Sequence, residues 1–269
     1  MIISVRGTDV NHHLFDPQKR PVVLESFYTA TKIIVFAQFT RDKILKEVPD
    51  LEDRKMVIIP HAVNLENAPH PFVEGLKLSG TEFLFLVPAG IRPVKNVLFC
   101  LRPLAALKEK YPFLRLIYAG PVLENAYGEQ FLKAIGNLDW VIYLGAVPHE
   151  KMLGLFNLVD VVINSSVSEG MPNAILEAMS LGKAVLVSKI PGNEAIVSDG
   201  IDGFVFSSES DFYSKAERLL QDRDLRKKLG DAAKKRIDLN FPKDQEIQNH
   251  IRVYREAIQA YFSTESQSS

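Results

Sequence analysis

Two segments of the sequence combine charged side chains with glycines in a way that suits a phosphorylated ligand. The first, residues 165–179, carries the carboxylates Glu169 and Glu177 with seven residues between them. It follows an apolar run and opens a helical pattern, with Pro172 placed as a first-turn proline. Free N–H groups at a helix start bind anions, and Gly170 lets a ligand approach the backbone. Two carboxylates so spaced can accept hydrogen bonds from hydroxyls on different parts of one sugar nucleotide.

The second segment, residues 88–96, follows another apolar run and contains Gly90, Arg92 and Lys95. Gly90 permits a tight turn. Arg92 can fork onto two phosphate oxygens while Lys95 supplies a point charge. Such cations stabilise the negative charge that a departing diphosphate gains in a transition state. The alternative for this segment is a surface loop whose basic side chains are merely solvated.

Two further loops begin after apolar runs and precede helical patterns. Residues 144–150 contain Gly145 and Val147, which could offer backbone contacts to a nucleobase, and we expect His149 to cap or decorate the helix start. Residues 190–194 contain Gly192, Asn193 and Glu194. Glu194 could contact a ligand, or it could be a first-turn acid that the helix dipole favours.

The elements that must position these loops alternate along the chain. The pattern predicts strands at 82–87, 114–119, 141–144, 161–164, 184–187 and 203–206, and helices at 96–110, 124–135, 150–157, 173–181 and 193–198. Strands that alternate with helices at this spacing form βαβ units around a parallel sheet. Several runs are continuously apolar, as strands covered on both faces are. We therefore predict an α/β, doubly wound domain over residues 81–242.

The ends of the chain differ from this domain. Residues 1–65 repeat the pattern with three strands, at 2–5, 32–36 and 56–59, and two helices, at 21–30 and 40–47, which makes a thin sheet for a domain. Residues 66–80 are rich in proline and glycine, as linkers are. The pattern after residue 206 is helical and charged; we expect a last helix over 243–262 and a disordered tail over 263–269.

Composition narrows the class of protein. The 269 residues are 46% hydrophobic and 24% charged, and Lys+Arg 32 against Asp+Glu 33 leaves a net charge of -1. With no basic excess we expect no nucleic-acid partner. The apolar runs are too short to span a bilayer, and the first residues lack the features of a secretory signal, so we expect a cytoplasmic protein. Cys100 is the one cysteine, and we expect a buried thiol.

In their order along the chain, these motifs resemble the family-4 retaining glycosyltransferases. The matching features are Gly90, Arg92 and Lys95, the two glutamates seven residues apart, and Gly192-Asn193-Glu194. Residues 4–11 are similar to the family's acceptor-domain loop, and residues 33–63 to its last strands and interdomain linker. The resemblance covers nearly the whole chain. It implies a GT-B type fold of two Rossmann-like doubly wound domains, the N-terminal one incomplete because no opening strand and glycine-rich loop is found.

The resemblance also implies roles for individual residues. Arg92 and Lys95 would grip the donor diphosphate, Glu169 would contact the donor sugar, and Glu177 would contact the ribose hydroxyls. The segment Gly170-Met171-Pro172-Asn173 would present backbone N–H groups to phosphate. Further donor contacts would come from Gly90, Gly145, Val147, Gly192 and Asn193, and acceptor-side contacts from Arg6, Gly7, Thr8 and Asp9. Family members use neither a metal nor another cofactor, and we expect none here.

The resemblance thus implies transfer of a hexose-type sugar from a nucleoside diphosphate to an acceptor hydroxyl, with retention of configuration. The alternative is a truncated, catalytically incompetent isoform that binds a nucleotide sugar or a protein partner. Two departures from the family bear on this choice: Arg92 and Lys95 are three positions apart where many members have five, and Arg6 stands where some relatives carry histidine. A glycoside hydrolase is disfavoured because its two carboxylates must flank the scissile bond.

Overall fold

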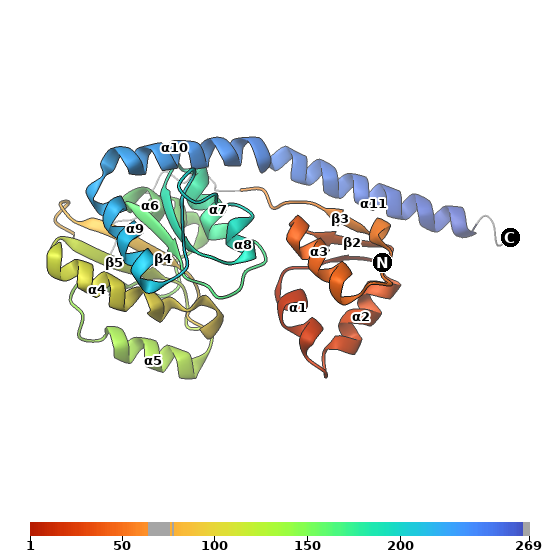
Figure 1. The fold of residues 1–269 in the computed structure, drawn as a ribbon. Helices are drawn as coiled ribbons and strands as arrows, with labels where there is room; N and C mark the ends of the chain where they lie inside the picture. The colour runs from red at the N-terminus through yellow and green to blue at the C-terminus, as the bar shows by residue number, and fades with distance from the viewer. Residues whose placement is uncertain (64–75, 77, 266–269) are drawn as a thin grey trace. The chain divides into compact units, whose positions relative to one another are not determined.

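The computed structural model describes residues 1–63, 76 and 78–265, which fold as two compact units (Figure 1). Unit 1 comprises Met1–Val63, Glu169–Met171 and Asn240–Ser269, and unit 2 comprises Asn64–Ser168 and Pro172–Leu239. Most of the predicted linker at 66–80 lies outside the described residues. Each unit is built on its own parallel sheet, which confirms the predicted α/β class.

Unit 1 is a three-stranded parallel sheet with short helices between its strands. The strands lie in the order β1-β2-β3 and are β1 (Ile2–Ser4), β2 (Lys32–Val35) and β3 (Met56–Ile58). The helices are α1 (Thr8–Asn11), α2 (Arg20–Thr29), α3 (Gln38–Glu47) and the 3-10 turns η1 (His13–Phe15) and η2 (Asp53–Lys55). The helix α1 was not predicted: it begins where the Asp9 carboxylate accepts the N–H groups of Arg6 and Gly7, at 3.0 and 2.8 Å.

The last helix of the chain, α11 (Lys243–Glu265), belongs to unit 1 and extends three residues beyond its predicted end. Its Val253 is 1% exposed and packs with Ile34, Phe36 and Ile59. Polar contacts add to this packing, since Glu246 accepts the N–H of Ala62 at 2.8 Å. The helix is therefore part of the core of this unit.

Unit 2 is a six-stranded parallel sheet in the order β6-β5-β4-β7-β8-β9. Its strands are β4 (Phe83–Pro88), β5 (Leu114–Ala119), β6 (Val141–Tyr143), β7 (Val161–Asn164), β8 (Ala184–Ser188) and β9 (Phe204–Phe206). The first strand of this unit, β4, lies in the middle of the sheet. The next strands, β5 and β6, are added on one side of β4, and β7 is then placed on its other side. The direction of winding therefore reverses between β4 and β7, which is the topological switch point of the sheet.

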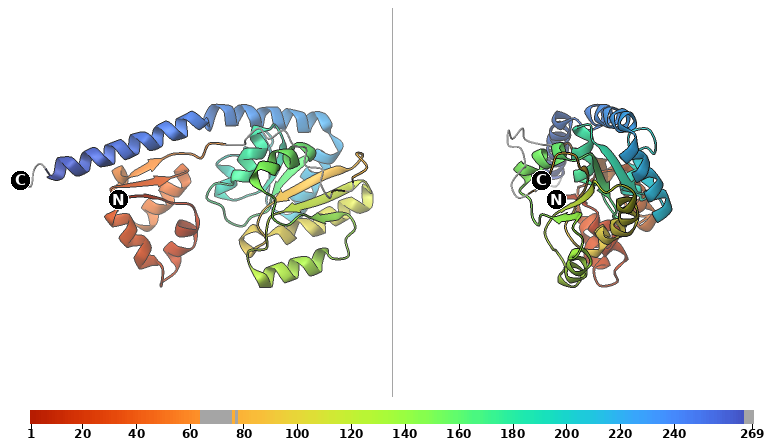
Figure 2. Two further views of the ribbon diagram at one scale, coloured as in Figure 1. Left: turned by 180° about the vertical axis from the view of Figure 1, so that it is seen from behind. Right: turned by 90° about the vertical axis from the view of Figure 1, so that its left-hand side faces the viewer.

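Helices cover both faces of this sheet (Figures 1 and 2). They are α4 (Leu101–Lys110), α5 (Asn125–Ile135), α6 (His149–Leu158), α7 (Asn173–Ser180), α8 (Pro191–Glu194), α9 (Glu209–Gln221) and α10 (Arg223–Asn240), with 3-10 turns η3 (Pro93–Lys95) and η4 (Val97–Cys100). Alternate strand residues such as Phe85, Leu116 and Ile163 share one apolar cluster with α4, α5 and α9. The thiol of Cys100 lies in this cluster, as predicted, and burial raises its pKa to about 12.

One helix prediction in this unit is wrong. The predicted helix at 193–198 is instead the short α8, Pro191–Glu194. The N–H of Ser198 is taken by the carboxylate of Asp202 at 2.7 Å, and Arg236 donates to the carbonyl of Ala195 at 3.2 Å. These side chains from outside the segment satisfy groups that a longer helix would have used itself.

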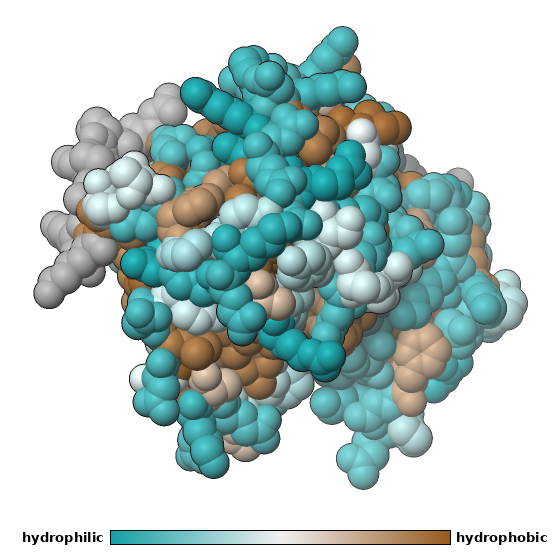
Figure 3. Space-filling model, turned by 60° about the vertical axis from the view of Figure 1, so that its left-hand side comes forward, coloured by the Kyte–Doolittle hydropathy of each residue, from teal (hydrophilic) through white to brown (hydrophobic). Residues whose placement is uncertain are grey.

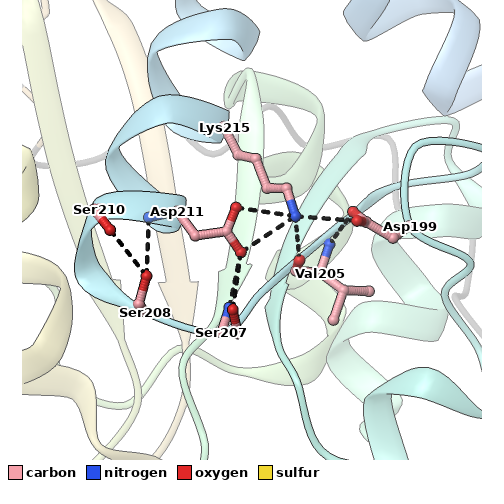
Figure 4. A network of polar contacts seen from close by, with 7 residues as sticks. All are labelled: Asp199, Val205, Ser207, Ser208, Ser210, Asp211 and Lys215. Carbon is pink, nitrogen blue, oxygen red and sulfur yellow. Dashed lines mark hydrogen bonds and ion pairs between the residues drawn. The ribbon is translucent and has the colours of Figure 1, made fainter.

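The edge strand β9 is fastened to the helix that follows it (Figure 4). Lys215 of α9 donates to Asp199 at 3.0 Å and pairs with Asp211 at 3.1 Å. The first turn of α9 is capped by Ser208, whose hydroxyl accepts the N–H of Asp211 at 3.2 Å. The Lys215 side chain is 15% exposed, whereas those of Asp199 and Asp211 are 50% and 30% exposed, so only the cation of this network is well shielded from solvent.

The molecular face in Figure 3 is largely hydrophilic, with small hydrophobic areas between the polar side chains. No helix within the described residues combines the length and apolar composition needed to cross a bilayer.

Candidate functional site

The loop that follows β4 carries Arg92 and Lys95 and is braced by the loop that follows β5. Ile91 donates its N–H to the carbonyl of Pro121 at 2.8 Å, and its own carbonyl accepts the N–H of Leu123 at 3.0 Å. A Cβ at Gly90 would lie 2.5 Å from the end of the Leu123 side chain, which would have to shift, so the glycine permits this close packing. The backbone that presents the two cations is thus held on one side.

The same loop is joined on its other side to the loop that follows β7. The hydroxyl of Ser165 lies 3.1 Å from the carbonyl oxygens of both Lys95 and Asn96, and the N–H of Val167 donates to Val94 at 3.0 Å. Asn96 adopts a left-handed conformation with φ 46°, which asparagine tolerates better than most residues. Two segments that are about seventy residues apart along the chain therefore form one hydrogen-bonded ledge.

This ledge stands at the topological switch point. Ligands of open α/β sheets bind outside the carboxyl ends of the strands, where the winding direction reverses. The two loops follow β4 and β7, which are neighbours in the sheet. The sequence placed each cationic or acidic motif after a strand, and the strand order brings the two motif-bearing loops together.

Arg92 lies half-buried in the loop after β4. Its Nε is buried and has no hydrogen-bond partner among the described residues. A buried N–H without a partner costs about 1–3 kcal/mol, and an anionic oxygen in hydrogen-bond reach would remove that cost. Because a buried Nε is not itself open to a ligand, a diphosphate would meet the terminal nitrogens of the guanidinium, and this contact stays a prediction.

Glu177 lies on α7, the helix that follows the β7 loop. Its side chain is 16% exposed, and Oε1 lies 3.3 Å from Nε2 of His149, the first residue of α6. Burial raises the pKa of Glu177 above its usual value, and the contact with His149 opposes that shift. The sequence missed this contact, because the two residues are 28 positions apart and no local signal links them.

The remaining loops at this sheet edge are linked in the same way. Gly145 accepts the N–H of Gly120 at 2.7 Å, which joins the loops after β5 and β6. The hydroxyl of Ser188 donates to the carbonyl of Ser166 at 2.6 Å, which joins the loops after β7 and β8. Asn193 is fully buried and donates to the carbonyl of Ser188 at 2.8 Å, so its amide group orders the loop after β8. Its Oδ1 has no partner among the described residues.

The other predicted positions of this unit lie in the same set of loops. Val147 is half-buried between β6 and α6, and Gly192 is buried in α8. Asn173 is exposed at the start of α7, and Pro172 is the N-cap residue, one position before the first turn in which it was predicted. No side chain caps α7, which leaves its first N–H groups without a side-chain partner from the cap position.

Glu169, Gly170 and Met171 belong to unit 1 together with the predicted acceptor-side residues. A Cβ at Gly170 would lie 2.7 Å from the carbonyl oxygen of Arg6, so only glycine fits there. The Nδ2 of Asn11 lies 3.5 Å from the carbonyl oxygen of Glu169. Met171 packs against the cluster that contains Ile34 and Val253.

The remaining acceptor-side positions form the turn that opens α1. Gly7 is buried with φ 120°, a conformation that favours glycine, Thr8 is exposed, and the Asp9 carboxylate holds the turn. The predicted cooperation of Glu169 with Glu177 stays a prediction, since the two residues lie in different units.

The family model described as Glycosyl transferases group 1 matches residues 71–236. The chain belongs to this family. The match runs from before β4 into α10 and therefore includes every unit 2 loop at the switch-point edge. It confirms the predicted family.

Among curated relatives, this group 1 glycosyltransferase is 26% identical over 241 residues to the Glycosyltransferase 1 domain-containing protein 1 of Xenopus tropicalis, covering 87% of this chain and 70% of that protein. It is 29% identical over 178 residues to the Putative glycosyltransferase EpsD of Bacillus subtilis, covering 64% of this chain and 45% of that protein. The chain thus spans only part of the length of both relatives.

Solved structures agree with the fold. The structure of Anabaena Alr3699/HepE in complex with UDP and glucose superposes with a TM-score of 0.83 at 17% identity, covering 94% of this chain and 71% of that one. Sucrose-phosphate synthase from Thermosynechococcus elongatus gives a TM-score of 0.78 at 18% identity, covering 96% and 68%. The structural neighbours are GT-B glycosyltransferases, which confirms the predicted fold type.

Proposed function

We propose that this chain transfers a sugar of the hexose type from a nucleoside diphosphate sugar to an acceptor hydroxyl, with retention of configuration. Membership of the group 1 glycosyltransferases supports sugar transfer. The observation that carries the choice of donor is the ledge at the switch point, where the Arg92–Lys95 loop is hydrogen-bonded to Ser165 and Val167. That is the position in which an open α/β sheet holds a phosphorylated ligand.

In this proposal, different residues of unit 2 contact different parts of the donor. Arg92 and Lys95 bind the diphosphate and stabilise the charge that it gains as the sugar departs. Glu177 accepts hydrogen bonds from the ribose hydroxyls, and the first N–H groups of α7 face the phosphates. The loop of Gly145 and Val147 contacts the base through its backbone, and Gly90, Gly192 and Asn193 shape the surrounding loops.

In unit 1 we propose Glu169 as the contact to the donor sugar hydroxyls and the turn of Arg6, Gly7, Thr8 and Asp9 as the acceptor side. The acceptor hydroxyl attacks the anomeric carbon on the face from which the diphosphate leaves, and its proton passes to an oxygen of the departing diphosphate, with no covalent bond to Glu169. The cationic side chains take the charge of the leaving group, so we propose transfer that needs no metal ion.

Calorimetry with UDP and GDP, followed by a nucleotide-release assay with their sugars and a panel of hydroxyl acceptors, tests the proposal. HepE is solved with UDP and with UDP-glucose, so UDP-glucose is the first donor to use. We expect binding, transfer that persists in EDTA, and a product whose anomeric configuration by NMR matches that of the donor.

Arg92→Ala and Glu177→Ala should lower transfer at least 10-fold while the protein stays folded, since each removes a charged hydrogen-bond partner worth about 1.5–3 kcal/mol. Lys227→Ala is the matched control, because Lys227 is an exposed cation that pairs with Asp231 on α10. A folded protein that gives no heat with either nucleotide contradicts the proposal. Binding without transfer to any acceptor corresponds instead to the alternative of a nucleotide-sugar-binding module.

A further inference from the structure

The contact between His149 and Glu177 joins two helices at the donor edge of unit 2. His149 begins α6, directly after the loop that contains Gly145 and Val147, and Glu177 lies in the middle of α7. The imidazole Nε2 and the carboxylate Oε1 are 3.3 Å apart. The histidine side chain is 61% exposed, whereas the glutamate side chain is 16% exposed.

The two side chains are unequal partners. A carboxylate that is mostly shielded from water needs hydrogen-bond donors, and His149 with its proton on Nε2 supplies one to a single oxygen of Glu177. With Nε2–H directed to Oε1, the imidazole does not engage the other oxygen, Oε2, which can then accept from a ligand. The same contact fixes the carboxylate plane, since a glutamate side chain otherwise rotates about its terminal torsion.

We propose that His149 is a positioning residue for nucleotide recognition: it holds Glu177 so that Oε2 meets the ribose hydroxyls of the donor. This inference rests on the proposed function, in which Glu177 binds the ribose. The loop after β6 would then act in two ways: its backbone contacts the base, and His149, which follows it, orients the carboxylate of Glu177 on α7. Recognition of base and ribose is then coupled through one imidazole.

The test compares affinities for UDP and GDP with those for their 2′,3′-dideoxy analogues, which lack the ribose hydroxyls. In the wild-type chain the hydroxyls should strengthen binding. His149→Phe removes the donor, and we expect UDP or GDP to bind about 3- to 10-fold more weakly, the size of one charge-assisted hydrogen bond with an exposed donor. The dideoxy analogues should bind the Phe variant as they bind the wild type, so the preference for ribose shrinks.

Two further variants separate positioning from a merely structural role. His149→Gln places an amide N–H near the position of Nε2, and we expect it to restore the ribose preference. Glu150→Gln changes the charge of the next, exposed residue in the same helical turn and should change neither affinity. Thermal unfolding of all variants checks that they fold.

An unchanged ratio between the ribose and dideoxy nucleotides in both His149 variants overturns the inference and leaves the proposed function intact. The inference is also overturned if His149→Phe weakens the binding of the ribose nucleotide and of its dideoxy analogue by the same factor, because a purely structural role would have that effect. A wild-type chain that binds neither UDP nor GDP overturns the inference together with the proposed function.

Discussion

Replacing Ser165 with alanine should loosen the cationic loop without touching a ligand. Ser165 is 3% exposed as a residue. Its hydroxyl lies between the carbonyl oxygens of Lys95 and Asn96. The carbonyl of Asn96 keeps a second donor, the N–H of Phe99 at 3.1 Å. The alanine Cβ fills nearly the same volume, so no cavity of consequence forms.

The magnitude follows from this geometry. Loss of the hydrogen bonds made by the buried Ser165 hydroxyl should lower the free energy of unfolding by about 1–2 kcal/mol. With a urea m-value of about 2 kcal/mol per molar, the midpoint should fall by about 0.5–1 M. If the loop must then be ordered when nucleotide binds, the same free energy weakens UDP or GDP binding by about 5- to 30-fold.

The assay has a built-in probe. Trp140 is the one tryptophan of the chain, and it is 5% exposed in the apolar cluster of unit 2, so its fluorescence reports on the unfolding of this unit. Calorimetry with UDP and GDP gives the affinity of the folded variant. Ser198→Ala is the matched control: its hydroxyl accepts from Arg236 at 2.6 Å, and it lies in the loop before β9, at the amino end of that strand.

We expect both serine variants to lose stability and only Ser165→Ala to lose affinity. If the two variants weaken nucleotide binding equally, or if Ser165→Ala changes the urea midpoint but not the affinity, the idea that the ledge positions the cationic loop is wrong.

Two other predictions follow from the geometry of unit 2. Burial raises the pKa of Glu177, and its carboxylate must be ionised to accept the ribose hydroxyls; nucleotide affinity should therefore fall on acidification with a midpoint above 4.5, the usual value for glutamate. Glu177→Gln should remove this part of the pH dependence, as measured by calorimetry between pH 4.5 and 8. The titration of the nucleotide phosphate affects both proteins equally. Identical profiles of affinity against pH for the wild type and the variant would contradict the assignment of Glu177 to the ribose. A raised pKa means that the folded state holds this proton more tightly than the unfolded state, so protonation of Glu177 does not itself unfold the chain. Gly230→Ala should cost about 1–3 kcal/mol, because its Cβ would collide with the carbonyl of Gly182, which is backbone and cannot rotate away. Asp231→Ala, which removes only an exposed ion pair, should shift the urea midpoint little, and an equal effect of the two substitutions would refute the steric argument.

The sequence alone determined the local elements of unit 2 and the places where chemistry occurs. Apolar runs marked the strands within a residue or two, as at Val161–Asn164, because a strand buried on both faces must be apolar throughout. Residue types also marked the loops after β4 and β7, because phosphate recognition calls for arginine, lysine, glycine and a helix start. Where a side chain from far along the chain takes a group that a longer helix would have used, as Arg236 takes the carbonyl of Ala195, the local pattern was misleading.

The tertiary structure decided which of these loops meet. No spacing in the sequence places β7 beside β4, and the contacts of Ser165 with Lys95 and of His149 with Glu177 join residues 70 and 28 positions apart. Hydrophobic periodicity reports which face of an element is buried, but not which element covers it. Strand order depends on the packing of the whole sheet, so the ledge and the positioning of Glu177 emerge only when the chain is folded.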